Sequence, residues 1–430
     1  MNIIIAILIF GLVIIFHEFG HFILAKKNGI TVTEFSLGMG PRLASFVKGG
    51  TRYSLKLFPI GGSCMMLGED EEVSDQGAFN SKGVWARISV IAAGPIFNFI
   101  LAFLLSLIML GLIGYDSPYI TNVSEEGPAA KAGLQKEDII TSINGSKIHF
   151  GREVQMYYYF HTIQPGDKLE IEYKRDGKKY NTTLVVEQMA LYQLGFTYVS
   201  NETAAQIEQI AEGGALEAAG FKAGDVITAI NGVPIASGKE LALYFNENPL
   251  NGSAITINYI RNNLDYSVEV TPNVIQNYTT GFNYNLYSQK TNGLNVIKYS
   301  FYEVKYWISS TIKSLGMMFQ GKVSTSDLGG PVRIVSEIGK VVDTSKKYGA
   351  LNLIIQLINW CVLLSANLGV MNLLPIPALD GGRLLFLLIE AIRGKPIDRE
   401  KEAYVHMAGF VMLMVLMVFI FYNDLKNLFF

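Results

Sequence analysis

Two histidines and a glutamate lie inside the first strongly apolar stretch of the sequence. The five residues from 17 to 21 read HEFGH, and they fall within NIIIAILIFGLVIIFHEFGHFILA. On a helix His17 and His21 are one turn apart, so both imidazoles project from one face with Glu18 beside them. Two histidine ligands next to a carboxylate base are typical of a zinc site that hydrolyses peptide bonds. The spacing predicts metal-dependent hydrolysis inside a membrane.

Two simpler interpretations explain this motif less well. An HExxH pattern in a soluble helix is often coincidence, but a residue inside a bilayer has no solvated face, and each ionised group there costs about 2.5–3.5 kcal/mol. A cleaved signal peptide would carry basic residues before its apolar run. This chain begins Met-Asn and has Lys26 and Lys27 after the run. The membrane-embedded metal site is the better interpretation.

The composition fits a membrane enzyme with a soluble part. The chain has 430 residues, of which 50% are hydrophobic and 17% charged, and its net charge is −2. Neither a nucleic-acid partner nor a disordered tail is expected from these values. The only cysteines, Cys64 and Cys361, fall in or beside apolar segments. They are expected to be small buried residues, with no disulfide framework or cysteine zinc cluster.

Three further stretches are long and apolar enough to span a bilayer. They are residues 88–114, 351–374 and 403–422, and the first two contain no charged residue. The sequence therefore predicts a multi-pass α-helical membrane protein with four transmembrane helices. The membrane domain would consist of residues 1–114 and 351–430.

Basic residues predict the orientation of the four spans. They gather between spans one and two and between spans three and four, whereas the N-terminal flank has none: Lys26, Lys27, Arg42, Lys48, Arg52, Lys56, Lys82, Arg87, Arg383, Arg393, Lys395, Arg399 and Lys401. By the positive-inside rule these two loops are cytoplasmic. Both termini and the segment 115–350 are then extracytoplasmic, and His17 lies in the cytoplasmic half of the bilayer.

The long segment between spans two and three repeats itself. Residues 127–145 return as residues 214–232, a shift of 87 residues that superposes Gly133 on Gly220, Asp138 on Asp225 and Asn144 on Asn231. Each copy predicts a short helix that ends at glycine and a strand that turns at Asn-Gly. The pattern resembles the PDZ domains of bacterial proteases, which predicts two α+β domains over 115–190 and 191–274. Such domains capture extended peptides or exclude bulky substrates, and both alternatives stay open.

The region from 275 to 350 is predicted to be a linker followed by an amphipathic helix. Residues 275–293 are rich in Asn, Tyr, Gly and Gln. Apolar residues then recur at helical spacing with lysines between them: Val304, Trp307, Ile308, Ile312, Leu315, Met318 and Phe319, with Lys298, Lys305 and Lys313. This helix is expected either to lie along the outer membrane surface or to pack against the bundle.

A third metal ligand is expected after the third span, because a catalytic zinc site needs three protein ligands and one open position. Residues 372–390 read NLLPIPALDGGRLLFLLIE. Pro375 and Pro377 break the helix near membrane depth, which is tolerated where the backbone lines a cavity. Asp380 follows the break and is the candidate ligand, with a helix N-cap as the alternative. Asn372 either satisfies freed backbone groups or holds a substrate peptide.

Together, HEFGH, AAGPIFNF, PIPALDGG and the tandem repeats resemble the site-2 protease family, specifically the bacterial RseP-type regulated intramembrane metalloproteases. The resemblance covers essentially the whole chain. It implies one zinc ion held by His17, His21 and Asp380, with Glu18 as the catalytic base. Residues 51–68 are similar to the family's membrane-associated β-hairpin loop, whose edge strand would clamp an unwound substrate. The residues expected to bind substrate are Gly61, Gly62, Asn372, Pro375 and Pro377.

The resemblance also implies the setting of the enzyme. A zinc metalloendopeptidase of this kind would sit in the bacterial cytoplasmic membrane and cleave single-pass membrane proteins, such as anti-sigma factors, after a first cleavage. Two rival functions were considered. A catalytically silent PDZ scaffold would not explain why ionisable residues are kept in apolar surroundings, and a metal transporter would be expected to repeat its transmembrane halves.

Overall fold

The computed structural model describes residues 2–69, 71, 73–322 and 329–429. Its contacts divide the chain into two compact units. One contains Met1–Ser117, His149–Phe160 and Leu286–Phe430, and the other contains Pro118–Ile148 and His161–Asn285. Each unit is described by itself. Residues 323–328, which belong to the predicted region 275–350, lie outside the described residues.

The first unit is built around long apolar helices. Within the described residues, four helices have the length and composition to cross a membrane: α1 (Asn2–Lys27), α2 (Val84–Ile113), α9 (Ala350–Leu373) and α11 (Arg399–Phe429). They coincide with the four spans predicted from the sequence. Only helices satisfy every backbone polar group within one segment, which is why these uninterrupted apolar runs are helical.

Small residues let three of these helices approach closely. A Cβ added at Gly20 of α1 would collide with the Ala93 carbonyl of α2, and one added at Gly369 of α9 would collide with the Phe99 ring of α2. Close approach at small residues is typical of helix packing in membranes. Helix α2 therefore packs against both α1 and α9.

A long hairpin follows α1. Its strands are β1 (Val32–Lys48) and β2 (Thr51–Met66), and it turns at Gly49 and Gly50, which both have positive φ. Residues 34–37 of β1 have partners both at 62–65 and at 52–55. The hairpin is folded back on itself, with 62–66 as an outer strand. The predicted residues 51–68 contain only the second strand of this hairpin, and its first strand, β1, precedes them.

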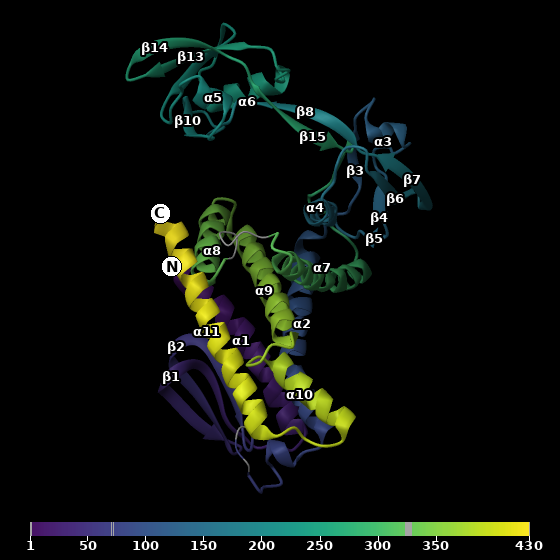
Figure 1. The fold of residues 1–430 in the computed structure, drawn as a ribbon, viewed down its shortest axis with the longest axis vertical. Helices are drawn as coiled ribbons and strands as arrows, with labels where there is room; N and C mark the ends of the chain where they lie inside the picture. The colour runs from purple at the N-terminus through teal and green to yellow at the C-terminus, as the bar shows by residue number, and fades with distance from the viewer. Residues whose placement is uncertain (1, 70, 72, 323–328, 430) are drawn as a thin grey trace. The chain divides into compact units, whose positions relative to one another are not determined.

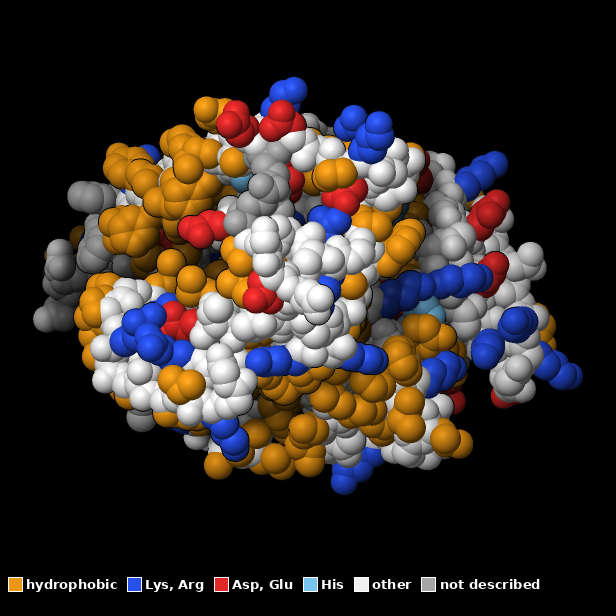
Figure 2. Space-filling model, turned by 90° about the horizontal axis from the view of Figure 1, so that it is seen from below, with side chains coloured by type: hydrophobic (Ala, Val, Ile, Leu, Met, Phe, Trp, Pro, Cys, Tyr) orange, Lys and Arg blue, Asp and Glu red, His pale blue; other side chains and the backbone are white. Residues whose placement is uncertain are grey.

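The hairpin exposes large hydrophobic side chains, including Met39, Leu43, Phe46, Val47 and Phe58. In the view from below, hydrophobic side chains form patches between lysine and arginine side chains (Figure 2). Exposed hydrophobic side chains that are grouped together mark a contact with membrane or protein.

Two helices precede α9. Helix α7 (Gly293–Phe319) packs against α2 and α9 through Val304, Trp307 and Ile308. For these residues the packing alternative is confirmed, whereas Ile312 and Phe319 are exposed on the same helix. Helix α8 (Pro331–Lys346) was not predicted as a separate element and packs against α1 and α9.

The second unit contains most of the two repeats, which form matching elements. The first copy comprises β3 (Ile120–Val123), α3 (Pro128–Lys131), β4 (Ile139–Ile143), β5 (Ser146–Lys147), α4 (Gly151–Phe160), β6 (Lys168–Arg175) and β7 (Lys178–Val185). The second comprises β10 (Ala205–Ile210), α5 (Ala215–Ala218), β11 (Val226–Ile230), β12 (Val233–Pro234), α6 (Gly238–Glu247), β13 (Ile255–Arg261) and β14 (Leu264–Val270). Helix α4 belongs to the first unit by its contacts.

The repeated residues have structural roles. Asn144 and Asn231 have positive φ at their Asn-Gly turns, as predicted. In the second copy the buried Asp225 accepts two hydrogen bonds of 2.7 Å from Arg261, and Asp138 makes the same bidentate pair with Arg175 in the first. The shared aspartate therefore fixes each fold.

The prediction of a linker over 275–293 is wrong for its first part. Residues Asn273–Thr279 form β15, which pairs with β8 (Glu187–Gln193), and Phe282–Tyr284 form β16, which pairs with β3. In the second copy β10 pairs in the same way with β9 (Phe196–Tyr198). The second repeat is thus inserted into the first, and a strand after it completes the first. Residues 275–293 are polar and were therefore interpreted as a linker. These strands could not be recognised locally, because the strands that pair with them are distant in sequence.

Candidate metal centre

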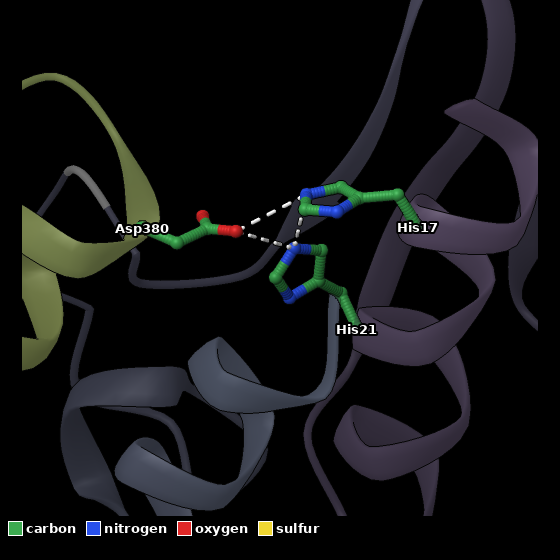
Figure 3. A group of neighbouring side chains, drawn as sticks. All are labelled: His17, His21 and Asp380. Carbon is green, nitrogen blue, oxygen red and sulfur yellow. Dashed lines mark hydrogen bonds and ion pairs between the residues drawn. The ribbon is translucent and has the colours of Figure 1, made fainter. Parts of the chain in front are cut away.

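The predicted ligands come from two helices that are distant in sequence. His17 and His21 lie one turn apart in α1, and both are buried. Asp380 is the first residue of α10 (Asp380–Arg393), the helix that follows the Pro-rich break after α9. Figure 3 shows the two imidazoles facing the Asp380 carboxylate.

Three donor atoms converge at this point. Asp380 Oδ2 lies 3.1 Å from His17 Nε2 and 3.4 Å from His21 Nε2, and the two Nε2 atoms are 3.2 Å apart. Tetrahedral zinc with bonds of about 2.0–2.1 Å separates its ligand atoms by about 3.3 Å. All three observed separations are close to that value.

The second nitrogen of His21 is held by helix α2. His21 Nδ1 lies 2.9 Å from the Val90 carbonyl oxygen, which can only accept a hydrogen bond. Nδ1 must therefore carry the proton, and the lone pair of Nε2 points toward Asp380. A ligating histidine is commonly oriented in this way by a carbonyl on its other nitrogen.

Asn98 of α2 holds His17 in a similar way. Its side-chain Nδ2 lies 3.2 Å from His17 Nδ1, and Asn98 is fully buried; with the amide turned, Oδ1 takes the same place and accepts as the Val90 carbonyl does. The Ser365 hydroxyl donates to the Asn98 carbonyl at 2.8 Å, which ties this part of α2 to α9. Helix α2 thus contributes one partner to each imidazole.

Glycine is required where α2 passes the imidazoles. A Cβ added at Gly94 would collide with the His21 ring and lie 2.7 Å from Cε1 of His17. The GPIFN segment therefore combines a glycine that admits the two rings with an asparagine that orients one of them.

The loop before Asp380 is irregular, as the prolines predict. Helix α9 ends at Leu373, and Leu379 is the N-cap of α10 without a side-chain hydrogen bond. The alternative of Asp380 as the N-cap is therefore wrong. A Cβ at Gly381 would collide with the Leu374 carbonyl, and one at Gly382 would meet the Ile376 carbonyl. The two glycines allow the first turn of α10 to pack directly on the loop.

Ion pairs hold α10 at two further places. Arg87 of α2 pairs with Glu390 through both guanidinium nitrogens, and Arg383 pairs with Glu69 in the segment after β2. Arg87 and Glu390 are each about 15% exposed, so this pair is better shielded from solvent than an ordinary surface pair. Helix α10 is thus fixed against α2 and against the segment that follows β2.

Glu18 lies between the ligands and the hairpin. A Cβ at Gly62 would be 2.9 Å from Glu18 Cγ, so the outer strand of the hairpin packs directly on this glutamate. Glu18 also interacts electrostatically with His17, His21 and Asp380. Of the residues predicted to bind substrate, Gly62 is therefore adjacent to the centre.

The other residues predicted to bind substrate lie nearby in the chain. Gly61 has positive φ, and a Cβ there would meet the Met39 side chain. Asn372 lies in the last turn of α9, and Pro375 and Pro377 lie in the loop before Asp380. Their role in binding substrate stays a prediction.

The donor set fits a zinc ion. Two imidazole nitrogens and one carboxylate oxygen, all within 4.8 Å of one another, form one group in the described residues. Within the described residues the buried Asp380 Oδ2 has no hydrogen-bond partner, and a cation at the point where it faces the two Nε2 atoms would satisfy it. Two histidines and one carboxylate, with a fourth position for water, are the ligands of catalytic zinc.

Sequence reasoning did not assign roles to Asn98, Val90 and Gly94. A polar residue within an uncharged span was the available signal for Asn98, because intramembrane polar groups are usually functional or paired. Val90 acts through its backbone and Gly94 through its lack of a side chain. Neither contribution can be recognised from residue type alone.

An HExxH helix among transmembrane helices, facing a carboxylate from a second helix, defines a metalloprotease of the membrane. The model of peptidase family M50 matches residues 5–416, and the chain belongs to this family. It is a zinc metalloprotease of the site-2 type. This family agrees with the resemblance based on HEFGH and PIPALDGG. The chain therefore belongs to neither a metal-transporter family nor a family of catalytically silent scaffolds.

Three relatives cover nearly the whole chain. The zinc metalloprotease RasP of Geobacillus kaustophilus is 32% identical over 98% of this chain and 97% of that protein, and RasP of Bacillus licheniformis is 34% identical over 100% of both. The regulator of sigma-W protease RasP of Bacillus subtilis is 33% identical over 98% of both. Among solved structures, the PDZ domain of HtrA3 matches 21% of this chain and 91% of its own, with 20% identity and a TM-score of 0.18.

Proposed function

We propose that this enzyme hydrolyses peptide bonds within or near transmembrane segments of single-pass membrane proteins, and that its substrates are anti-sigma factors or similar regulators already shortened by a first protease. The convergence of His17, His21 and Asp380 at 3.1–3.4 Å, beside Glu18 on a membrane-spanning helix, carries this proposal. The name of the Bacillus subtilis relative, regulator of sigma-W protease, supports the substrate class.

In this proposal His17, His21 and Asp380 hold one zinc ion. When bound, zinc supplies Lewis-acid chemistry to the hydrolytic water and the scissile carbonyl. Glu18 accepts a proton from the attacking water and passes it to the leaving amine nitrogen. The hydrogen bonds at Nδ1 keep each imidazole in the tautomer that offers Nε2.

The hairpin is proposed to receive the substrate. A transmembrane helix satisfies its own backbone hydrogen bonds, so the substrate must unwind before its carbonyl can be attacked. The outer strand 62–66 offers backbone groups to an extended segment, which compensates for the lost helical bonds. The lack of a side chain at Gly62 lets this strand pack directly against Glu18, so a segment paired with the strand would lie close to the proposed base.

The proposed topology follows the positive-inside rule. The hairpin and the loop between α10 and α11 face the cytoplasm, and both termini and the two PDZ-like repeats face outward, in the bacterial cytoplasmic membrane. The exposed apolar residues of α7 are proposed to contact the outer membrane surface. The repeats then restrict access by size or capture a peptide.

Two substitutions test the assigned roles. Glu18→Gln should leave zinc bound and abolish cleavage, because the base is lost while the ligands remain. Asp380→Ala should lower both the zinc content and the activity, because one ligand is lost from an enclosed site. Zinc per purified protein and cleavage of a reconstituted single-pass substrate give the two readouts.

Contrary results would be clear in either case. A Glu18→Gln enzyme that cleaves within a few-fold of the unmodified enzyme would remove Glu18 as the base. Unchanged zinc content and zinc affinity in Asp380→Ala would show that Asp380 is not a ligand. Proteomic comparison of membrane-protein fragments in cells with active and Glu18→Gln enzyme would then identify the substrate.

A further inference from the structure

A histidine outside the metal centre contacts the loop that carries Asp380. The Ala378 backbone N–H donates to His406 Nδ1 of α11 at 2.9 Å. Ala378 lies two residues before Asp380, at the point where the chain turns from the Pro-rich break into α10. His406 therefore binds the loop close to the metal ligand without touching the ligand itself.

The hydrogen-bonded residue has an unfavourable backbone conformation. Ala378 has φ +75°, a left-handed conformation that residues with a Cβ rarely adopt. Such a conformation persists only where neighbouring contacts hold it. The His406 hydrogen bond is made by the backbone N–H of this residue, so it acts where the strain is located.

The geometry also defines the tautomer of His406. Because the Ala378 N–H is a donor, Nδ1 must be unprotonated in this arrangement and Nε2 carries the proton. Nε2 lies 3.8 Å from Glu402 Oε1, one turn earlier on α11. The Phe386 ring of α10 lies 5.5 Å from the imidazole, centroid to centroid. The ring is thus bounded by its own helix on one side and by α10 on another.

Helix α11 meets the same loop at a second point. A Cβ added at Gly409 would collide with Cβ of Pro377 and lie 2.6 Å from its carbonyl oxygen. His406 and Gly409 are one turn apart, so one face of α11 contacts two consecutive loop residues. Elsewhere on α11 most of the described large hydrophobic side chains are exposed. Among the described residues α11 is also attached to α8, where Asp424 accepts hydrogen bonds from the Gly330 and Arg333 N–H groups.

We propose that His406 is a positioning residue for the metal ligand Asp380: it accepts the Ala378 N–H, holds that residue at positive φ, and thereby directs the Asp380 carboxylate toward His17 and His21. This inference rests on the proposed role of Asp380 as a ligand. In this proposal α11 must be packed against the loop for the zinc site to be complete, although α11 supplies no ligand.

The test compares two side chains of nearly equal shape at position 406. Asn places Oδ1 near the position of His Nδ1 and can accept the Ala378 N–H, whereas Leu cannot. His406→Leu should lower the zinc affinity of the full-length protein in detergent by about ten- to one-hundred-fold, the range for loss of a hydrogen bond that supports a metal site. His406→Asn should stay within about three-fold of the unmodified protein on the same scale of affinities.

A double variant tests the conformational part of the proposal. Glycine accepts positive φ without strain, so His406→Leu combined with Ala378→Gly should bind zinc more tightly than His406→Leu alone. Equal losses in the Asn and Leu variants, or no recovery in the double variant, would mean that α11 packing and not the Ala378 hydrogen bond matters. Either result overturns the proposal.

A metal-free measurement separates this inference from the proposed function. Hydrogen exchange of the backbone amides of Ile376, Ala378 and Leu379 in zinc-free protein should accelerate in His406→Leu and remain slow in His406→Asn. Unchanged exchange in His406→Leu would refute the positioning role, whatever Asp380 does. If exchange accelerates but Asp380→Ala binds zinc normally, the hydrogen bond holds the loop and it is the ligand assignment that fails. That second result also overturns the proposed link between His406 and the metal.

Discussion

The Asn98 side-chain amide lies 3.2 Å from Nδ1 of His17, and both residues are buried between α1 and α2. The orientation of this amide decides which nitrogen of His17 is free. With Oδ1 toward the ring, Asn98 accepts the Nδ1 proton and leaves the Nε2 lone pair for a metal. In the structure Nδ2 faces Nδ1, and the buried Oδ1 has no hydrogen-bond partner among the described residues. Exchanging the two amide atoms gives Oδ1 the Nδ1 proton as its partner.

Asn98→Ala should therefore lower zinc affinity by about ten- to one-hundred-fold, because His17 loses the acceptor that fixes its tautomer. Asn98→Asp keeps an acceptor at the same place and should bind zinc more tightly than Asn98→Ala. Competition with a chromophoric chelator measures both affinities. Equal affinity in the alanine variant and the unmodified enzyme would show that Asn98 only packs.

Gly94→Ala should weaken the metal centre through sterics alone. The added Cβ would collide with the His21 ring, and the two rings are held by hydrogen bonds at Nδ1. Overpacking of this kind costs about 1–3 kcal/mol, which corresponds to about a five- to one-hundred-and-fifty-fold loss of affinity if it falls on the site. Zinc affinity and thermal stability in detergent measure the effect.

Gly111→Ala is the matched control for that substitution. Gly111 lies on the same helix, and a Cβ there would meet nothing within 4 Å. It should bind zinc as the unmodified enzyme does. Equal losses in the two variants would show that helix propensity or membrane insertion, and not contact with the imidazoles, is responsible.

The sequence predicted the convergence of His17, His21 and Asp380 for a physical reason. Helical periodicity places His17 and His21 on one face whatever surrounds them, and Pro375 and Pro377 mark the break from which Asp380 projects. The positions of β15 and β16 could not be predicted in the same way. A strand that completes a domain from far along the chain depends on partners such as Val123, which pairs with Phe282.

The residues that support the ligands were also hidden, because their contributions depend on tertiary contacts. His406 lies in the predicted fourth span with no motif around it, and its partner is a backbone N–H. Val90 contributes a carbonyl oxygen to His21 and could be replaced by other residues without losing it. The sequence motifs therefore indicated the chemistry but not the residues that orient the predicted ligands.

The Asp225–Arg261 pair predicts a loss of stability in acid. Burial alone would raise the pKa of Asp225, but hydrogen bonds from Arg261 and from the Lys222 N–H outweigh burial and hold this pKa below its usual range. A carboxylate with a lowered pKa stabilises the fold above its unfolded pKa of about 3.9, and that contribution is lost as pH falls through the folded value. The second repeat should lose stability below about pH 4.

Asp225→Asn should remove most of that pH dependence and cost about 2–3 kcal/mol at pH 7, less than for a fully buried pair because the Arg261 side chain is 24% exposed. The exposed Asp265→Asn provides the comparison. Pulse proteolysis of the full-length protein across pH reports the unfolding of the repeat. A pH profile that is the same in Asp225→Asn as in the unmodified protein would assign the acid sensitivity to other groups.

The pairing of β8 with β15 allows the second repeat to be removed cleanly. Ala190 is paired with Gln276, so replacing residues 191–275 by Asn-Gly closes a short hairpin and keeps β16 available for β3. If the repeats exclude bulky substrates, the shortened enzyme should cleave a substrate with a large external domain that the intact enzyme refuses. Its zinc content should not change, because His17, Glu18, His21 and Asp380 all lie outside the removed segment.

A substrate trimmed to a short external stub is the control, since the intact enzyme should accept it and the shortened enzyme should cleave it at a similar rate. Both enzymes are compared in the same reconstituted membranes with equal zinc per protein. If the shortened, zinc-loaded enzyme no longer cleaves the stub, the second repeat delivers substrate to the centre and does not filter it. If both enzymes cleave the stub and neither cleaves the substrate with the large external domain, the first repeat alone excludes bulky substrates. That repeat is still completed by β16 in the shortened enzyme.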